Sequence, residues 1–335
     1  MNKFKYYFIL SITTLSLFSC SKNDTTEITP PREYSEQFTT DITDIEEYLN
    51  NYYITVTNNP GAPDDQDVVF TKIPTGGQQP SIMSYKNSTT FPKLLSRDVK
   101  FHDVMYKLYY LVLREGTGTS PTNVDGVLAS YKGEYLEQVI DADKVTTLTA
   151  TPFEEVKYPQ QVLSLYSTIL GWGEIFPQFK SGTYSSNNDG TVSYKDFGAG
   201  VMFIPSGLAY FNTGSGTIPS YAPLVFSFKL YEVQRLDQDG DGIPSYLEDL
   251  NGDGYMYNFT NTVLYPTTPA SNPDDTDGDG VPNFLDVDDD GDNYTTKLEI
   301  TKTDGTYYAF GDIPNCSGNT TDPARLKKHL DKNCH

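Results

Sequence analysis

The chain has 335 residues and a formal net charge of −21. This length is usual for about two domains. Hydrophobic residues make up 37% of the sequence, and 26 tyrosines with 18 phenylalanines supply much of the apolar area, which fits aromatic-rich modules joined by polar segments. The acidic balance argues against nucleic acid as a partner, because phosphate binding needs clustered Lys and Arg. Cations are the expected partners instead.

The N-terminus has the pattern of an export signal. A basic start is followed by an apolar run over residues 6–18 and by Ser19-Cys20, and the run is short for a membrane-spanning helix. Its ending resembles a bacterial lipobox, which implies that residues 1–19 are removed and that Cys20 carries the lipid that anchors the chain to a membrane. Serine after this cysteine resembles outer-membrane lipoproteins of Gram-negative bacteria, facing the periplasm or the surface. A plain secretory signal with a chance cysteine is the alternative.

A polar tether and a small N-terminal module are expected next. Residues 20–40 are rich in Ser, Thr, acidic residues and Pro, which predicts a flexible segment. Four apolar residues then stand at helical spacing and predict a helix of about ten residues: Ile45, Tyr48, Leu49 and Tyr52. Short strands are predicted at 54–56 and 68–73. We expect this module, residues 41–95, to pack on the domain that comes after it.

The central region, residues 96–235, predicts an α+β fold. Apolar runs and turn signals indicate strands near 104–113, 127–131 and 224–231, and a short helix over 172–179. These elements give an antiparallel sheet wrapped on one short helix.

Five motifs succeed one another in this region: Val127-Leu-Ala-Ser-Tyr-Lys-Gly133, Ile169-Leu-Gly-Trp172, Lys180-Ser-Gly182, Ile204-Pro-Ser-Gly-Leu-Ala-Tyr210 and Ile218-Pro-Ser-Tyr-Ala-Pro-Leu-Val-Phe226. Together they resemble the FKBP family of peptidyl-prolyl cis-trans isomerases. The resemblance implies isomerase activity in protein folding, with no cofactor for catalysis. It also implies that proline-containing polypeptides bind between the sheet and the helix, with the only tryptophan at the pocket floor.

The resemblance carries six pocket residues over to this chain: Tyr131, Asp141, Ile169, Trp172, Tyr210 and Phe226. It implies that the tryptophan, the isoleucine and the phenylalanine surround the proline ring and the twisted amide. The second tyrosine would hydrogen-bond a substrate carbonyl, and the first would form a polar rim with the aspartate. Each aromatic residue taken singly is more often a core residue.

Several positions depart from the family pattern. Ile140 replaces an aromatic residue, the connection from 133 to 141 is one residue short, and Phe211 stands where glycine is usual. Residues 144–168 are expanded, so a further pocket aromatic cannot be placed. These departures favour the alternative of a non-catalytic lipoprotein that binds proline-containing chains or serves in adhesion, with the calcium repeats of the next segment as a spacer. His102, His329 and His335 form no metal or triad pattern and are expected to be solvated.

The segment 236–300 is strongly acidic. Between Asp237 and Glu299 it holds 16 acidic residues and one basic residue. Acidic residues recur at positions 1, 3, 5 and 12 of three loops, with glycine or asparagine at position 6, which is calcium-loop spacing. With the position-7 carbonyls of two loops, the predicted ligands are Asp237, Asp239, Asp241, Ile243, Glu248, Asp275, Asp277, Asp279, Val281, Asp286, Asp288, Asp290, Asp292 and Glu299.

A partial copy of the calcium loop is present at Asp249, Asn251 and Asp253 and lacks an acid at the twelfth position. Prolines after the seventh positions are unlike a helix-flanked EF-hand and resemble thrombospondin type 3 repeats, which implies structural calcium. A disordered acidic tail is the alternative. In the last segment, residues 301–335, Cys316 and Cys334 can pair in an oxidising compartment; two free thiols are the alternative.

Overall fold

The computed structural model describes residues 30–334, so the lipidation predicted at Cys20 lies outside the described residues. Residues from Glu33 onward form one compact unit. None of the helices within residues 30–334 has the length and apolar character needed to cross a membrane.

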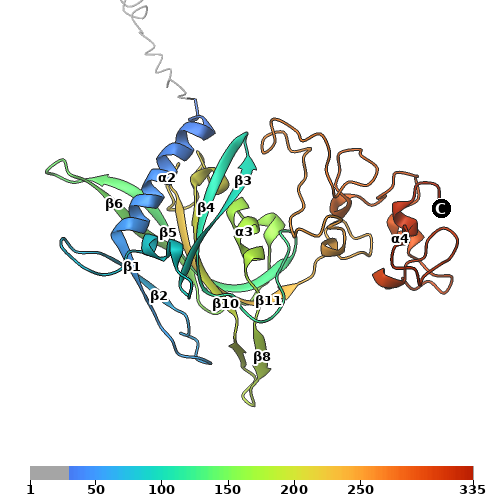
Figure 1. The fold of residues 1–335 in the computed structure, drawn as a ribbon, viewed down its shortest axis with the longest axis horizontal. Coiled ribbons are helices and arrows are strands. Elements are labelled where there is room, and N and C mark those ends of the chain that lie inside the picture. The colour runs from blue at the N-terminus through green and yellow to red at the C-terminus, as the bar shows by residue number, and fades with distance from the viewer. Residues whose placement is uncertain (1–29, 335) are drawn as a thin grey trace, which may run out of the picture. The chain divides into compact units, whose positions relative to one another are not determined.

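A seven-stranded antiparallel sheet forms the centre of the fold and curls around a short helix, α3 (Leu170–Ile175) (Figure 1). Its strand order is β3-β4-β10-β11-β5-β6, with β7 paired to β5. The strands are β3 (Lys93–Phe101), β4 (Val104–Arg114), β5 (Gly126–Ile140), β6 (Thr146–Val156), β7 (Leu163–Ser164), β10 (Gly198–Ile204) and β11 (Leu224–Gln234). The predicted α+β class, with an antiparallel sheet wrapped on a short helix, is confirmed.

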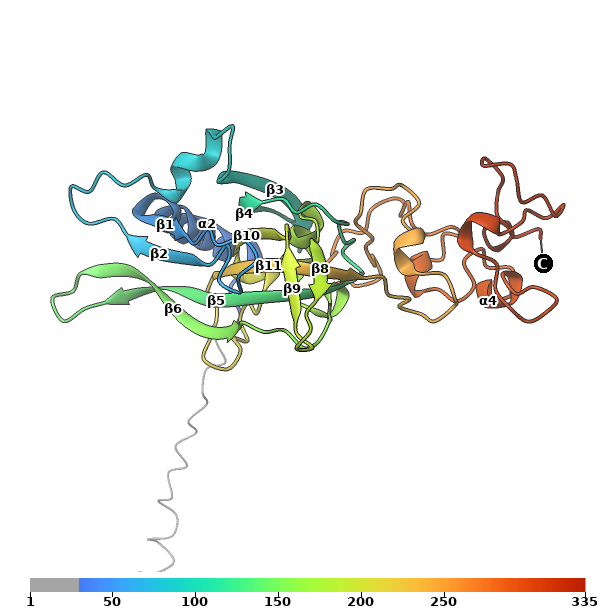
Figure 2. The ribbon, with the colours of Figure 1, turned by 90° about the horizontal axis from the view of Figure 1, so that it is seen from below.

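Strand β4 shows why residues 108–113 form an uninterrupted apolar run. Alternate side chains of a strand point to opposite faces. Tyr106, Leu108 and Tyr110 pack in one core with Trp172 of α3. Tyr109, Leu111 and Leu113 pack in a second core with residues of the N-terminal helix α2 (Tyr34–Asn51). The sheet is therefore covered on both faces, by α3 on one and α2 on the other. Figure 1 shows both helices, and Figure 2 shows α2 from a second side.

Helix α2 is longer than the sequence predicts. It begins at Tyr34, so the predicted tether over 20–40 ends too late. The extra turns bury Gln37 and Asp41, whose side chains hydrogen-bond each other at 2.6 Å. Because these buried residues are polar, apolar spacing could not reveal them. The predicted strands correspond to β1 (Tyr52–Val56) and β2 (Val68–Lys72), and the expected packing of this module on the sheet is confirmed by the shared core.

A further hairpin and the acidic segment complete the unit. Strands β8 (Thr183–Ser186) and β9 (Val192–Lys195) pair only with each other. The acidic segment is built mostly from turns, with two single-turn 3-10 helices, η5 (Ser245–Leu247) and η6 (Asn283–Leu285), and one short α-helix, α4 (Thr296–Glu299). Two small apolar clusters stabilise it, one around Met256 and Phe284 and the other around Ile243 and Ile300. The segment is folded and is not a disordered tail.

Candidate functional site

An aromatic cavity of about 620 Å³ opens between α3 and the neighbouring strands. Five of the six predicted pocket residues line it: Tyr131, Ile169, Trp172, Tyr210 and Phe226. They come from β5, from the start of α3, from the loop after β10 and from β11. The fold thus brings together residues that are spread over almost a hundred positions of the sequence.

Trp172 forms the floor of this cavity. Its ring lies 5.0 Å from Tyr131 and 5.2 Å from Phe226, both nearly perpendicular, which is the favoured edge-to-face geometry. Only 4% of the Trp172 side chain is exposed. Gly171 lets α3 approach the sheet, because a Cβ there would lie 2.5 Å from Cγ2 of Ile204. The tryptophan is therefore held rigidly with its neighbours around it.

Phe153 supplies the pocket aromatic that the sequence could not place. It lies on β6, inside the expanded stretch 144–168, and its ring meets Phe226 edge-on at 5.6 Å. A Cβ at the facing Gly133 would come within 2.3 Å of Cζ of Phe153, so glycine is needed there. A strand assigned to residues 146–156 would have indicated this residue. In the structure the stretch pairs with β5, and Phe153 lines the cavity.

Two tyrosine hydroxyl groups belong to residues that line the cavity. The Tyr131 hydroxyl donates to Oε2 of Glu154 at 2.9 Å, and burial together with this carboxylate raises the pKa of Tyr131. Among residues 30–334 the Tyr210 hydroxyl has no hydrogen-bond partner, although it lines the same cavity. Tyr210 can therefore donate to a bound carbonyl without breaking an existing bond.

Asp141 does not belong to the site. It is exposed at the tip of the β5–β6 hairpin, where Oδ1 accepts from the backbone N–H groups of Asp143 and Val145. Nine strand residues, 132–140, lie between it and Tyr131, which corresponds to roughly 30 Å along the strand. The β5–β6 hairpin continues well beyond the cavity and carries Asp141 away from it. Glu154 on the return strand takes the place that was expected for Asp141, as the partner of Tyr131.

A stack of three rings extends the cavity on one side. Tyr34 of α2 lies 3.7 Å from the ring of His102 and 4.0 Å from Phe211. Phe211, where the family has glycine, adopts a positive φ of 39°. Burial lowers the pKa of His102 to about 4, so this ring is neutral at neutral pH. The expectation of solvated histidines is wrong for His102 and for His329, which is also buried; His335 lies outside the described residues.

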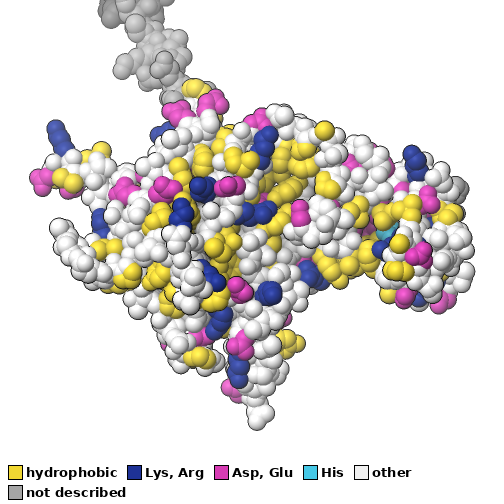
Figure 3. All heavy atoms as spheres, in the orientation of Figure 1, with side chains coloured by type: hydrophobic (Ala, Val, Ile, Leu, Met, Phe, Trp, Pro, Cys, Tyr) yellow, Lys and Arg dark blue, Asp and Glu magenta, His cyan; other side chains and the backbone are white. Residues whose placement is uncertain are grey.

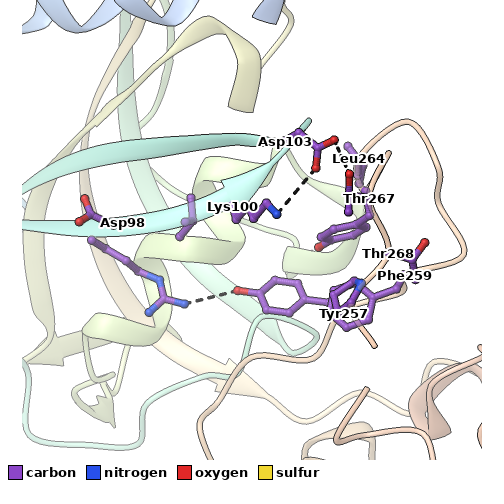
Figure 4. Close-up of a pocket in the computed structure, with 12 residues that line it drawn as sticks. Asp98, Lys100, Asp103, Tyr257, Phe259, Leu264, Thr267 and Thr268 are labelled. Atoms are coloured by element: carbon purple, nitrogen blue, oxygen red, sulfur yellow. Dashed lines mark hydrogen bonds and ion pairs between the residues drawn. The ribbon is translucent and has the colours of Figure 1, made fainter. Parts of the chain in front are cut away.

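The segment after the sheet packs beside the cavity. Glu174 of α3 is buried and pairs with Arg97 at 2.9 Å, and the Tyr257 hydroxyl donates to the same carboxylate at 3.0 Å. Figure 4 shows Tyr257 and Phe259 facing β3 across a second hollow, of about 380 Å³. Figure 3 shows hydrophobic side chains gathered beside β3 in this region. Leu264 reaches the aromatic cavity itself.

The acidic segment forms three compact loops, named here the first loop (237–248), the second loop (275–286) and the third loop (288–299). In each, the aspartates at positions 1, 3 and 5 bring carboxylate oxygens within 4.8 Å of one another. The position-1 aspartate accepts from the backbone N–H of position 6, which has positive φ in every loop: Gly242, Gly280 and Asn293. Asparagine therefore performs the role of glycine in the third loop.

Many carboxylate oxygens in these loops are buried and lack a hydrogen-bond partner in the described part of the chain. They include both oxygens of Glu248, Asp289 and Glu299. Burial and neighbouring carboxylates raise the pKa of Glu248 to about 11 and that of Glu299 to about 8. An oxygen-only donor set of this kind suits a hard divalent cation.

Cys316 and Cys334 lie next to each other as free thiols. Burial and the neighbouring Cys316 raise the pKa of Cys334 to about 12. The disulfide stays a prediction.

The fold and the site define an α+β protein with an aromatic cup followed by oxygen-rich loops. A family model described as BamM C-terminal matches residues 238–323, which comprise nearly all of the acidic segment and the first part of the C-terminal segment. No curated protein matches the chain.

Solved structures similar to the chain include two bacterial proteins. One is a peptidyl-prolyl cis-trans isomerase from Pseudomonas syringae pv. tomato, with 22% identity over 45% of this chain and 86% of that one, at a TM-score of 0.29. The other is FkpA from Escherichia coli, with 28% identity over 38% of this chain and 48% of that one, at a TM-score of 0.27.

Proposed function

We propose that the chain is a peptidyl-prolyl cis-trans isomerase that acts on exported proteins. The observation that carries this proposal is the cavity floored by Trp172 and enclosed by Tyr131, Phe153 and Phe226, next to the free hydroxyl of Tyr210. Rotation about an X-Pro bond needs no nucleophile and no proton transfer to a leaving group. The barrier is about 18–20 kcal/mol and arises from amide resonance.

An aromatic cavity lowers this barrier by favouring the twisted amide. When the bond rotates, resonance is lost and the amide becomes less polar, so leaving water costs it less than it costs the planar form. Trp172, Ile169 and Phe226 surround the proline ring in this proposal. The Tyr210 hydroxyl donates to a substrate carbonyl, while Tyr131, held by Glu154, orients the chain at the rim.

The test is a protease-coupled assay on the full chain with an Ala-Leu-Pro-Phe peptide. Trp172→Leu is expected to lower kcat/KM by about tenfold or more, the equivalent of 1.4 kcal/mol in the transition state. Tyr210→Phe removes one hydrogen bond and is expected to cost about threefold to tenfold. The control is Tyr184→Phe, an exposed tyrosine on β8. If the wild-type chain does not accelerate the exchange, the enzyme proposal is refuted.

The second candidate is a protein that binds proline-containing chains without turning them over. The wall of Tyr34, His102 and Phe211 favours it, because this stack extends the cavity beyond the space needed for one proline. Titration with the same peptide, followed by Trp172 fluorescence, separates the two functions. Saturable binding together with an unchanged exchange rate supports the binding protein.

The acidic loops are proposed to bind structural calcium. Support comes from the buried oxygens without partners in the described part of the chain and from the clustered carboxylates. Loop spacing adds the backbone carbonyl of Ile243, and calcium takes six to eight such oxygen ligands. Bound calcium would neutralise the clustered carboxylates and hold the loops in shape. Calcium titration followed by circular dichroism tests this, and an unchanged spectrum up to millimolar calcium counts against it.

The cellular setting is proposed to be the envelope of a Gram-negative bacterium, with the chain anchored to the outer membrane through lipid on Cys20. The signal-like first twenty residues support this. Cys20→Ala is expected to move the protein from the membrane fraction to the soluble fraction. Retention of the variant in the membrane fraction would contradict lipid anchoring.

A further inference from the structure

Asp289 occupies a place that calcium-loop spacing does not explain. It is the second residue of the third loop, where no ligand is expected, yet its carboxylate lies with those of Asp241 and Glu248 from the first loop. The ligand atoms of these three residues are all within 4.8 Å of one another. A cluster therefore forms between two loops that are distant in sequence.

The members of this cluster are buried without compensation. Asp289 is 2% exposed and Glu248 3% exposed, and none of their four carboxylate oxygens has a hydrogen-bond partner in the described part of the chain. Oδ2 of Asp241 is also buried and has no hydrogen-bond partner in the described part of the chain. Burial of unpaired carboxylates costs several kcal/mol each, and a cation at the centre of the cluster would offset this cost.

The surroundings hold the two loops together at this point. Ile243 of the first loop packs with Ile300, directly after the third loop, and both are 1% exposed. Lys297 donates to the carbonyl of Gly240 at 3.1 Å. The backbone N–H of Asp289 donates to the buried hydroxyl of Thr296 at 3.2 Å, which orients the residue. The approach of Asp289 to the first loop is thus built into the packing.

We propose that Asp289 is a ligand of the calcium ion of the first loop, so that one ion is held jointly by the first and third loops. This rests on the proposed calcium binding. With Asp237, Asp239, Asp241 and Glu248, the joint site offers five carboxylates and the Ile243 carbonyl. So many oxygens suit calcium, whereas magnesium keeps several waters in a strict octahedron. The first site is complete only when the third loop is folded against it.

Calorimetric titration of calcium into the full chain tests the joint site. Asp289→Asn is expected to weaken one site at least tenfold while the other sites keep their affinity. Glu248→Gln is expected to weaken the same site, so the double variant should lose affinity at that one site and keep the other sites unchanged. Asp304→Asn, which removes one exposed charge outside the cluster, is the matched control.

A second measurement separates ligation from a merely structural role. In chelator, Asp289→Asn should raise the melting temperature, because it removes one buried unpaired charge. In saturating calcium, the stabilisation gained on binding should be smaller than in the wild type.

Wild-type affinity at every site of Asp289→Asn, or a double variant in which two different sites are weakened, would overturn the joint site. A wild-type chain that binds no calcium would instead refute the calcium proposal as a whole. Neither result bears on isomerase activity, which the peptide assay measures separately.

Discussion

Asp41 is predicted to make stability depend on pH between about 4 and 6. Its carboxylate is fully buried under the loop that carries Tyr210. Oδ2 accepts from the backbone N–H and the hydroxyl of Ser206, each at 2.7 Å, and Oδ1 accepts from Gln37. Burial raises the pKa of Asp41 from 3.8 to about 6, assisted by the charge of Asp44, while the hydrogen bonds oppose the shift. Asp41→Asn removes the titration and keeps the shape.

The size of this pH effect on stability is set by the pKa of Asp41 in the unfolded chain and by its pKa in the folded protein. A shift from 3.8 to about 6 is about 2 units, or about 3 kcal/mol at 1.36 kcal/mol per unit. Between these pH values the folded protein retains a proton that the unfolded chain has lost. The free energy of unfolding therefore falls as the pH rises through this window, and the contribution is level above pH 6. The Asp41→Asn variant has no ionisable group at this position, so its stability lacks this pH dependence.

Urea unfolding from pH 4 to pH 7, in saturating calcium and followed by Trp172 fluorescence, measures this effect. The variant should gain about 3 kcal/mol relative to the wild type as the pH rises from 4 to 7. Asp98→Asn, an exposed aspartate on β3, is the matched control and should show no relative change. If the free energy of unfolding changed with pH equally in Asp41→Asn and in the wild type, the assignment of the raised pKa to Asp41 would be refuted.

Two substitutions near the cavity carry further predictions. Gly133→Ala should displace the Phe153 ring, lower the free energy of unfolding by about 1–3 kcal/mol and weaken peptide binding. Gly311→Ala is the control: it has open space around it and should change neither the stability nor the peptide binding. Glu174→Gln should lower the free energy of unfolding, measured in urea, by about 3 kcal/mol, because Arg97 loses its buried charged partner. Adding Arg97→Met to this variant should recover part of the loss. If the losses of the two single variants simply added in the double variant, the pairing would be contradicted.

The parts of the site that could be predicted are those fixed by local motifs. Tyr131, Trp172 and Phe226 stand in short segments whose order and spacing resemble a known family, and the sheet brings these segments together. The apolar run of β4 likewise indicates a strand, because a sheet covered on both faces needs apolar side chains on both.

The parts that could not be predicted depend on contacts over long distances in the sequence. Asp141 was assigned to the site wrongly because the residues around it do not show that the paired strands of the β5–β6 hairpin continue as far as Ile140. Phe153 was missed because its stretch has no motif, although it pairs directly with β5. Asp289 stands outside the loop spacing and meets the first loop only through folding. Spacing rules describe one loop at a time and cannot reveal a residue shared between two.

The predicted boundary at residues 235–236 divides regions that the structure joins through Glu174. This carboxylate lies two residues after Trp172, and its charge needs donors because it is buried. Arg97 comes from the sheet and Tyr257 from the acidic segment, while the Tyr255 hydroxyl donates to the Glu174 carbonyl at 3.0 Å. Any loosening of the acidic segment would therefore remove donors from the helix that carries the cavity floor. The loops and the cup are linked in stability, so conditions that unfold the loops also disturb the cavity.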